Sequence, residues 1–272
     1  MKNENPAQVE PKTQIAPQDS QDSPADFQYE DLELSVSEML KSGVHFGHKK
    51  SRWNPKMKPF TFGMKNNIHI IDLDKTLKCF QDALEYLGGV VKNGGKILFV
   101  GTKPQAKRLI EKAAQAVEMP YISSRWLGGT FSNFGEIKKR IKYLNDQEDK
   151  LGRGEFEKYT KYEKSQLKKE IDKMNEKMGG IKKMENLPQA IFVADIKEDA
   201  LAVKEARGAK VPVMAIVDTN TDPTLVDYPI PGNDDALSSI RYILGIITKG
   251  IKDAKKSASA AVENEAEKEA KS

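Results

Sequence analysis

Short apolar runs, each the length of a β-strand, recur along the chain with helix-like segments between them. The longest lie at residues 96–100, where only Lys96 is polar, and at residues 190–194 and 213–217. Shorter ones lie at residues 68–71, where His69 is the exception, and at residues 121–122 and 228–230. A strand that is apolar throughout needs cover on both faces, whereas a half-exposed strand alternates apolar and polar residues. The pattern therefore predicts an α/β fold with a doubly wound, mostly parallel sheet.

Helices are expected in the intervals between these strands. The first begins at Asp74, which can cap it, and ends at Gly94-Gly95. The second spans residues 104–117, with a proline in its first turn, where a missing N–H costs no hydrogen bond. Two more are expected over residues 198–207 and from Asn233 or Asp234 onward.

Two helices with a heptad pattern interrupt this alternation. Their apolar residues recur at intervals of three, four and seven, over residues 137–151 and again over residues 167–181, with Gly152 and Gly154 between them. The pattern predicts an inserted antiparallel coiled-coil hairpin over residues 132–184. Three uses remain open for it: a lever into RNA, a clasp for a partner protein, or a stabilised projection.

The two ends of the chain differ from its interior in composition. Residues 1–33 hold two basic and eight acidic residues, and residues 255–272 are a low-complexity mixture of Ala, Lys, Glu and Ser. Segments of this kind bury too little apolar surface to offset the entropy lost on ordering. The first is predicted to be a disordered tail and the second a disordered or loosely helical one, which leaves residues 34–131 and 185–254 as the α/β sheet domain.

Neither disulfides nor membrane insertion are expected. Cys79 is the single cysteine, and no apolar run approaches the length of a membrane-spanning helix. The N-terminus also lacks the order of charged and apolar residues found in signal peptides. These features predict a cytoplasmic protein.

Positive charge is concentrated in two stretches. The net charge is +4, and because the first 33 residues carry −6, the remainder carries +10. Residues 41–71 hold seven basic and no acidic residues, and residues 86–110 hold five basic and no acidic ones. A solvated face would explain one such stretch, but two in one chain favour a nucleic acid as the partner.

The segment 96–104 combines a strand, the turn Gly101-Thr102-Lys103 and the start of a helix. Doubly wound folds commonly bind phosphate groups at such a place. The turn lacks both Gly-x-Gly-x-x-Gly and Gly-x-x-x-x-Gly-Lys-Ser/Thr, the two specific nucleotide-binding patterns. We interpret Lys103 as a contact to RNA phosphate, and an enzyme that binds a phosphorylated metabolite is the alternative.

Few residues suggest catalysis or metal binding. His45 and His48 have no cysteine nearby, which argues against a closed structural zinc site. Asp195, Asp218 and Asp222 each follow a strand and could together hold a hard cation, although turn and helix capping is the favoured explanation. No set of nucleophile, base and orienting residue can be assembled, so no catalytic residue is predicted.

Both tryptophans directly follow an arginine, in Arg52-Trp53 and Arg125-Trp126. Indole and guanidinium planes can stack on unpaired bases. The simpler interpretation is that the indoles anchor their loops to the core. The complete set of candidate RNA-binding residues is His45, His48, Lys49, Lys50, Arg52, Trp53, Lys56, Lys58, Lys65, Lys103, Lys107, Arg108, Arg125, Trp126, Asn133, Lys138, Lys139 and Arg140.

Several blocks of the sequence closely resemble the bacterial ribosomal protein S-two family of the small subunit. They lie in the family's order and span about residues 36–251, and only the acidic N-terminal extension departs from the family's shorter start. The blocks are Val44-His45-Phe46-Gly47-His48, residues 53–57, 68–73, 99–103, Arg125-Trp126-Leu127-Gly128-Gly129-Thr130, residues 187–212, 217–223 and 230–236.

This resemblance implies a flavodoxin-like sheet domain with a coiled-coil insertion, located between the head and body of the small subunit in the cytoplasm. It implies binding to small-subunit ribosomal RNA, contact with neighbouring small-subunit proteins, and help in recruiting ribosomal protein S-one. It also implies that the protein is not an enzyme, needs no cofactor, and binds neither DNA nor a membrane.

Overall fold

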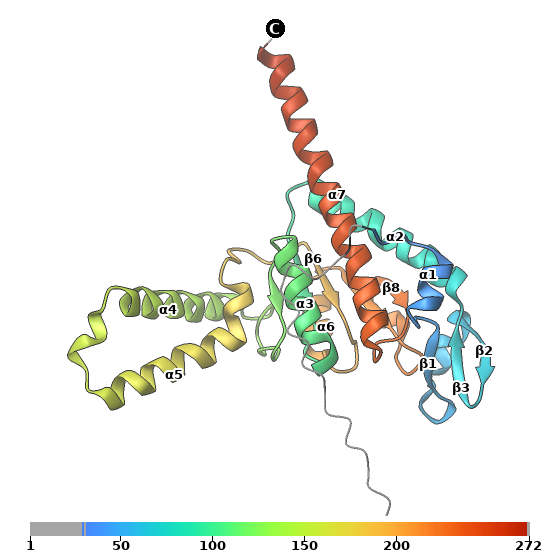
Figure 1. Ribbon diagram of the computed structural model, residues 1–272, viewed down its shortest axis with the longest axis horizontal. Coiled ribbons are helices and arrows are strands. Elements are labelled where there is room, and N and C mark those ends of the chain that lie inside the picture. Colours follow the sequence, from blue (N-terminus) through green and yellow to red (C-terminus); the bar gives the residue numbers. More distant parts are fainter. Residues whose placement is uncertain (1–28, 30, 271–272) are drawn as a thin grey trace, which may run out of the picture.

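A five-stranded parallel sheet forms the centre of the computed structural model, which describes residue 29 and residues 31–270 (Figure 1). Its strand order is β5-β4-β6-β7-β8, and all four pairings are parallel. Counted along the chain, this is the order 2-1-3-4-5 of flavodoxin-like sheets, so the predicted parallel α/β fold is confirmed. The strands are β4 (Ile97–Val100), β5 (Tyr121–Ile122), β6 (Ala190–Val193), β7 (Val213–Val217) and β8 (Tyr228–Pro231).

Hydrophobic cores lie on both faces of this sheet. Along β4, Ile97 and Phe99 point into one core and Leu98 and Val100 into the other, and all four side chains are fully buried. The first core is covered by α2 (Leu73–Lys92), α3 (Pro104–Ala116) and α7 (Leu237–Ala270). The second is covered by α6 (Ala200–Gly208) and by the inner parts of α4 (Phe134–Gly152) and α5 (Lys161–Met178).

A small antiparallel sheet, with the order β1-β3-β2, lies beside the large one (Figure 1). Only β3 was expected from the sequence. Asn66 and Asn67, both with positive φ, join β2 to β3 in a tight hairpin. Its strands are β1 (Phe46–Lys49), β2 (Thr61–Lys65) and β3 (Ile68–Ile71), and the neighbouring short helices are α1 (Val36–Lys41), η2 (Lys50–Arg52) and η3 (Pro55–Phe60).

The inserted helices α4 and α5 project away from the sheet (Figure 1). Ile141, Leu144 and Ile171 are buried near the root, whereas Leu151 towards the tip is 45% exposed. Coiled-coil packing along the full length therefore stays a prediction. The remaining short helices are η4 (Glu155–Lys158) at the tip, η5 (Gly179–Ile181) after α5, and η6 (Pro223–Leu225) before β8.

The described residues of the two predicted tails contact or continue the folded part. Tyr29 and Leu32 pack against the first core, and residues 1–28 and residue 30 lie outside the described part. At the other end, α7 continues to Ala270 through most of the predicted tail 255–272, as its alanine, lysine and glutamate content favours. None of the helices described is both long and apolar enough to cross a bilayer.

Candidate functional site

A buried group of charges occupies the carboxyl-terminal edge of the large sheet, with Lys103 at its centre. The Lys103 Nζ lies 3.1 Å from Asp195 Oδ2, 2.9 Å from Asp234 Oδ1 and 2.6 Å from Asp235 Oδ1. The side chains of Lys103, Asp195 and Asp234 are 15%, 8% and 2% exposed. One ammonium group thus neutralises carboxylates that would otherwise be buried without a counter-charge.

The strand order explains why these residues meet. Lys103 follows β4 and Asp195 follows β6, and these two strands are neighbours although a long stretch of sequence separates them. Their junction is the switch point at which doubly wound sheets usually bind a ligand. In this protein, Lys103 and the aspartates that pair with it occupy the switch point.

Lys103 is therefore not placed to contact RNA phosphate, which corrects the interpretation from sequence. Burial alone would lower the pKa of Lys103, but the carboxylates of Asp235 and Asp234 raise it above its usual value. Burial, together with the carboxylates of Asp218 and Asp195, raises the pKa of Asp234 to about 7 despite Lys103. A phosphate group would meet like charge at this edge, so the turn 101–103 is also unsuited to a phosphorylated metabolite.

His48 lies against the same edge from β1. Its Nδ1 is 3.1 Å from Asp218 Oδ2 and its Nε2 is 3.4 Å from Asp235 Oδ2. Its backbone N–H donates to Thr219 Oγ1 at 2.7 Å, and a Cβ at Gly47 would come within 2.5 Å of the Thr219 side chain. Only glycine lets the β1 backbone come this close to Thr219, and this contact holds His48 in position. The hydrogen bond to Asp218 raises the pKa of His48, although burial would lower it.

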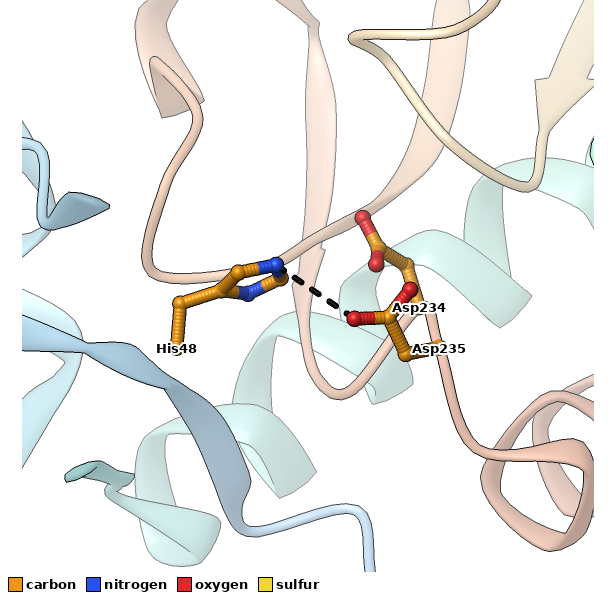
Figure 2. A group of neighbouring side chains, drawn as sticks. All are labelled: His48, Asp234 and Asp235. Carbon is orange, nitrogen blue, oxygen red and sulfur yellow. Dashed lines mark ion pairs between the residues drawn. The ribbon is translucent and has the colours of Figure 1, made fainter.

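One group at this edge brings three possible metal ligands together, although two of them also pair with Lys103. Ligand atoms of His48, Asp234 and Asp235 lie within 4.8 Å of one another, and Figure 2 shows the three side chains pointing toward a common point. Asp234 Oδ2 is buried and has no hydrogen-bond partner in the described structure. The predicted set Asp195, Asp218 and Asp222 is wrong in part, because Asp222 pairs with Lys56 at 2.6 Å instead.

Three exposed lysines meet at one end of the small sheet. Lys49 on β1 and Lys65 on β2 both pair with Ile68 of β3, from opposite sides, and the Lys50 N–H donates to the Asn67 carbonyl at the same end. Arg52 is exposed in η2, two residues after Lys50, and none of these four cations lies within 4.0 Å of a described carboxylate. We call Lys49, Lys50, Arg52 and Lys65 the cationic end. Lys58 is also exposed, but it precedes Thr61 of β2, which pairs with Ile71 at the opposite end of the sheet.

The two tryptophans differ in their surroundings. Trp126 is 6% exposed and packs edge-on against Phe131 with centroids 5.3 Å apart, so its indole anchors a loop and is not open to a base. Trp53 is half-buried and stacks on His69 at 5.0 Å. His45 is half-buried against Phe46, with ring centroids 3.9 Å apart, and burial lowers its pKa.

The other candidate residues lie on the hairpin root and on α3. Lys138, Lys139 and Arg140 are exposed on α4, where Lys139 pairs with Glu136 at 2.6 Å, and Asn133 precedes this helix. Arg125 is exposed in the loop before Trp126. Lys107 is half-buried and Arg108 exposed on α3, so these residues lie on other elements than the cationic end.

Glu205 on α6 organises the loop that carries Trp126 and was not found from the sequence. Its carboxylate accepts hydrogen bonds from the backbone N–H groups of Gly129 at 2.8 Å, Phe131 at 3.0 Å and Ser132 at 3.4 Å. These bonds lower the pKa of Glu205 although burial opposes them. Glu205 lies 73 to 76 residues away from these partners, so no local sequence pattern could reveal the contacts.

Glu205→Ala is expected to lower the free energy of unfolding by about 2 kcal/mol, because it leaves these N–H groups without an acceptor. Urea denaturation of the full chain measures the change. The matched control is Glu198→Ala, an exposed glutamate just before the same helix, which should stay within about 0.5 kcal/mol of the wild type. Equal effects of the two substitutions would contradict the role given to Glu205.

Comparison with known proteins identifies the family. A family model described as Ribosomal protein S2 matches residues 39–254. "Small ribosomal subunit protein uS2" of Roseiflexus sp. (strain RS-1) is 51% identical over 210 residues, covering 77% of this chain and 80% of the relative. The protein of the same name from Tolumonas auensis is 47% identical over 222 residues, covering 82% and 92%. The matched span holds both sheets, the hairpin and the charged edge, and the chain belongs to the ribosomal protein S2 family.

Proposed function

We propose that this protein binds small-subunit ribosomal RNA chiefly through the cationic end. The observation that carries the proposal is the convergence of Lys49, Lys50 and Lys65 at one end of the small sheet, without described carboxylates to neutralise them. Clustered cations of this kind bind a phosphate backbone and release its counterions. The exposed residues Lys138 and Arg140 at the hairpin root would make a second, separate contact.

Family membership gives the setting of this proposal. Proteins of the family are structural components of the small ribosomal subunit in the cytoplasm and not enzymes, so the alternative of a metabolite-binding enzyme is wrong. Recruitment of ribosomal protein S-one is the further role that the family resemblance supports. The division into a sheet domain and an inserted hairpin at 132–184, which we also propose, would let the two parts contact different RNA segments.

The RNA proposal is tested by titrating the full chain with small-subunit ribosomal RNA at a series of salt concentrations. The logarithm of the binding constant should fall linearly with the logarithm of salt concentration, with a slope that reports the number of phosphates contacted. A DNA duplex of equal charge should bind less tightly at the same salt. Binding that does not depend on salt, or that prefers the duplex, would refute the proposal.

We also propose that His48, Asp234 and Asp235 hold a divalent cation of the zinc class. Asp218 Oδ2 lies 3.1 Å from the His48 Nδ1 and can accept its proton, which leaves the Nε2 lone pair for a ligand. A cation at Nε2 would replace its present contact with Asn220 Nδ2, which lies 3.0 Å away. The unpartnered Asp234 Oδ2 supplies a buried anionic oxygen. Imidazole nitrogen combined with carboxylate oxygen suits Zn²⁺ better than Mg²⁺, which prefers oxygen alone.

Zn²⁺ is expected to bind the full chain with a one-to-one stoichiometry, measured by calorimetric titration. His48→Gln removes the nitrogen ligand and should abolish saturable binding, and Asp218→Asn should weaken binding about tenfold through the orientation of His48. Asp222→Asn is the control, because Asp222 lies outside the group and should leave binding unchanged. Equal Zn²⁺ binding by the wild type and His48→Gln would refute the site.

A further inference from the structure

Two tyrosines stack on the surface where α2 meets the edge strand β8. The rings of Tyr86 and Tyr228 have centroids 4.4 Å apart and an interplanar angle of 16°. The Tyr86 hydroxyl donates to the Gln189 carbonyl at 3.4 Å, which holds its ring from the other end. The pair is therefore a pre-ordered aromatic surface, and no part of the proposed RNA or metal site uses it.

Carboxylates surround this stack. Asp82 and Glu85 on α2, and Asn93 directly after it, line a cleft of about 500 Å³ together with both tyrosines. Asp82 and Glu85 are exposed, and neither lies within 4.0 Å of a basic group in the described part of the chain. Two unpaired carboxylates thus flank an aromatic surface in a protein whose charge beyond residue 33 is otherwise strongly positive.

The chemistry of the cleft favours a cation. An aromatic face attracts a cation through its quadrupole, and carboxylates beside it add direct ionic attraction. An unpaired RNA base could also stack on a tyrosine, but Asp82 and Glu85 would repel the phosphates that accompany it. Arginine suits the place better than lysine, because its planar guanidinium can stack on a ring and bond a carboxylate with two N–H groups.

We propose that the Tyr86–Tyr228 cleft docks an arginine-bearing segment of another protein in the small ribosomal subunit. The inference goes beyond the proposed RNA binding and does not need it, because the cleft uses none of the cations of the cationic end. It gives the protein two surfaces of opposite charge, one for nucleic acid and one for a basic protein segment.

Two neighbouring glycines provide matched variants. Gly89 lines the cleft and Gly88 does not, and a Cβ added to either would meet nothing within 4 Å. Gly89→Lys places a positive charge in the cleft, whereas Gly88→Lys makes the same change one position away on the same helix. Asp82→Asn combined with Glu85→Gln removes the two negative charges with little change of shape.

The probe is a capped peptide of alternating arginine and glycine, titrated into the full chain while the ring resonances of Tyr86 and Tyr228 are followed by NMR. Saturable shifts are expected in the wild type and in Gly88→Lys. Gly89→Lys and the Asp82→Asn, Glu85→Gln double variant should bind about tenfold more weakly. A lysine-glycine peptide should bind less tightly than the arginine peptide.

Several results would overturn the proposal. They are an absence of ring shifts, equal binding by Gly88→Lys and Gly89→Lys, no loss in the double variant, or equal affinity for the two peptides. A uridine oligonucleotide that shifts the same tyrosine resonances would also overturn it, in favour of a base-binding surface. Because the rings report locally, binding of the peptide to the acidic N-terminal segment does not enter the measurement.

A second measurement uses the assembled particle. A photo-crosslinking phenylalanine analogue is placed at exposed Asn93 in the cleft, and small subunits that contain this chain are irradiated. A crosslink to an arginine-containing peptide of one small-subunit protein, suppressed by Gly89→Lys and kept in Gly88→Lys, supports the proposal. A crosslink to RNA, or none at all, contradicts it.

Discussion

Replacing Lys103 with methionine is expected to lower the free energy of unfolding by about 3 kcal/mol, because it leaves Asp195 and Asp234 buried without a counter-charge. Methionine has a similar length and keeps the packing of the aliphatic stem. Urea denaturation near neutral pH measures the change. Affinity for ribosomal RNA should stay unchanged once the folded fraction is taken into account, because the ammonium group is turned into the protein.

The matched control is Lys56→Met. Lys56 also pairs with one aspartate, Asp222 at 2.6 Å, but its side chain is 58% exposed. Removal of such a surface pair should cost less than about 1 kcal/mol. If instead Lys103→Met were as mild as the control and weakened RNA binding, the reading of Lys103 as a phosphate contact would be restored.

The second large effect concerns the cationic end. Exchange of Lys49, Lys50, Arg52 and Lys65 for glutamine should weaken binding to small-subunit ribosomal RNA about 100-fold at moderate salt and lower the salt slope by up to about 4. Each substitution removes one cation and leaves a side chain of similar size. Since all four residues are exposed, the free energy of unfolding should hardly change.

The control removes the same amount of charge elsewhere. Lys78, Lys92, Lys96 and Lys204 are exposed on other elements, and their exchange for glutamine changes the net charge equally. This variant should keep most of the affinity and most of the salt slope. Equal losses in the two variants would show that net charge alone, and not the cationic end, determines binding.

The large sheet could be predicted because its signal is local. The runs that became β4, β6 and β7 are apolar throughout, and every residue of these strands is buried. Such runs need helices on both faces, which the chain supplies in alternation. Strand order followed from the family resemblance and not from the runs themselves.

The small sheet was missed because its strands carry little hydrophobic pattern. In β2 no residue is fully buried and Phe62 is 80% exposed, so neither alternation nor a continuous apolar run marks it. A segment of this kind is held by pairing with β3 and not by its own burial. Sequence patterns report burial, and where burial is small they predict poorly.

The charged edge could be predicted only in part. The residues that follow strands were singled out, but their pairing depends on contacts between distant segments, such as Lys103 with Asp234, 131 residues away. From sequence alone Lys103 looked like a cation without a partner. The fold places three carboxylates around Lys103, so this residue forms structural ion pairs and not the phosphate contact that the sequence suggested.

The central claim is that cations left free by the fold hold this protein on the small ribosomal subunit. Sedimentation tests it most directly, with the full chain mixed with small subunits that lack their own copy of the protein and run through gradients of increasing salt. We predict that the chain travels with the subunits at moderate salt and is released at high salt. A chain that stays at the top of the gradient in every condition would contradict the account.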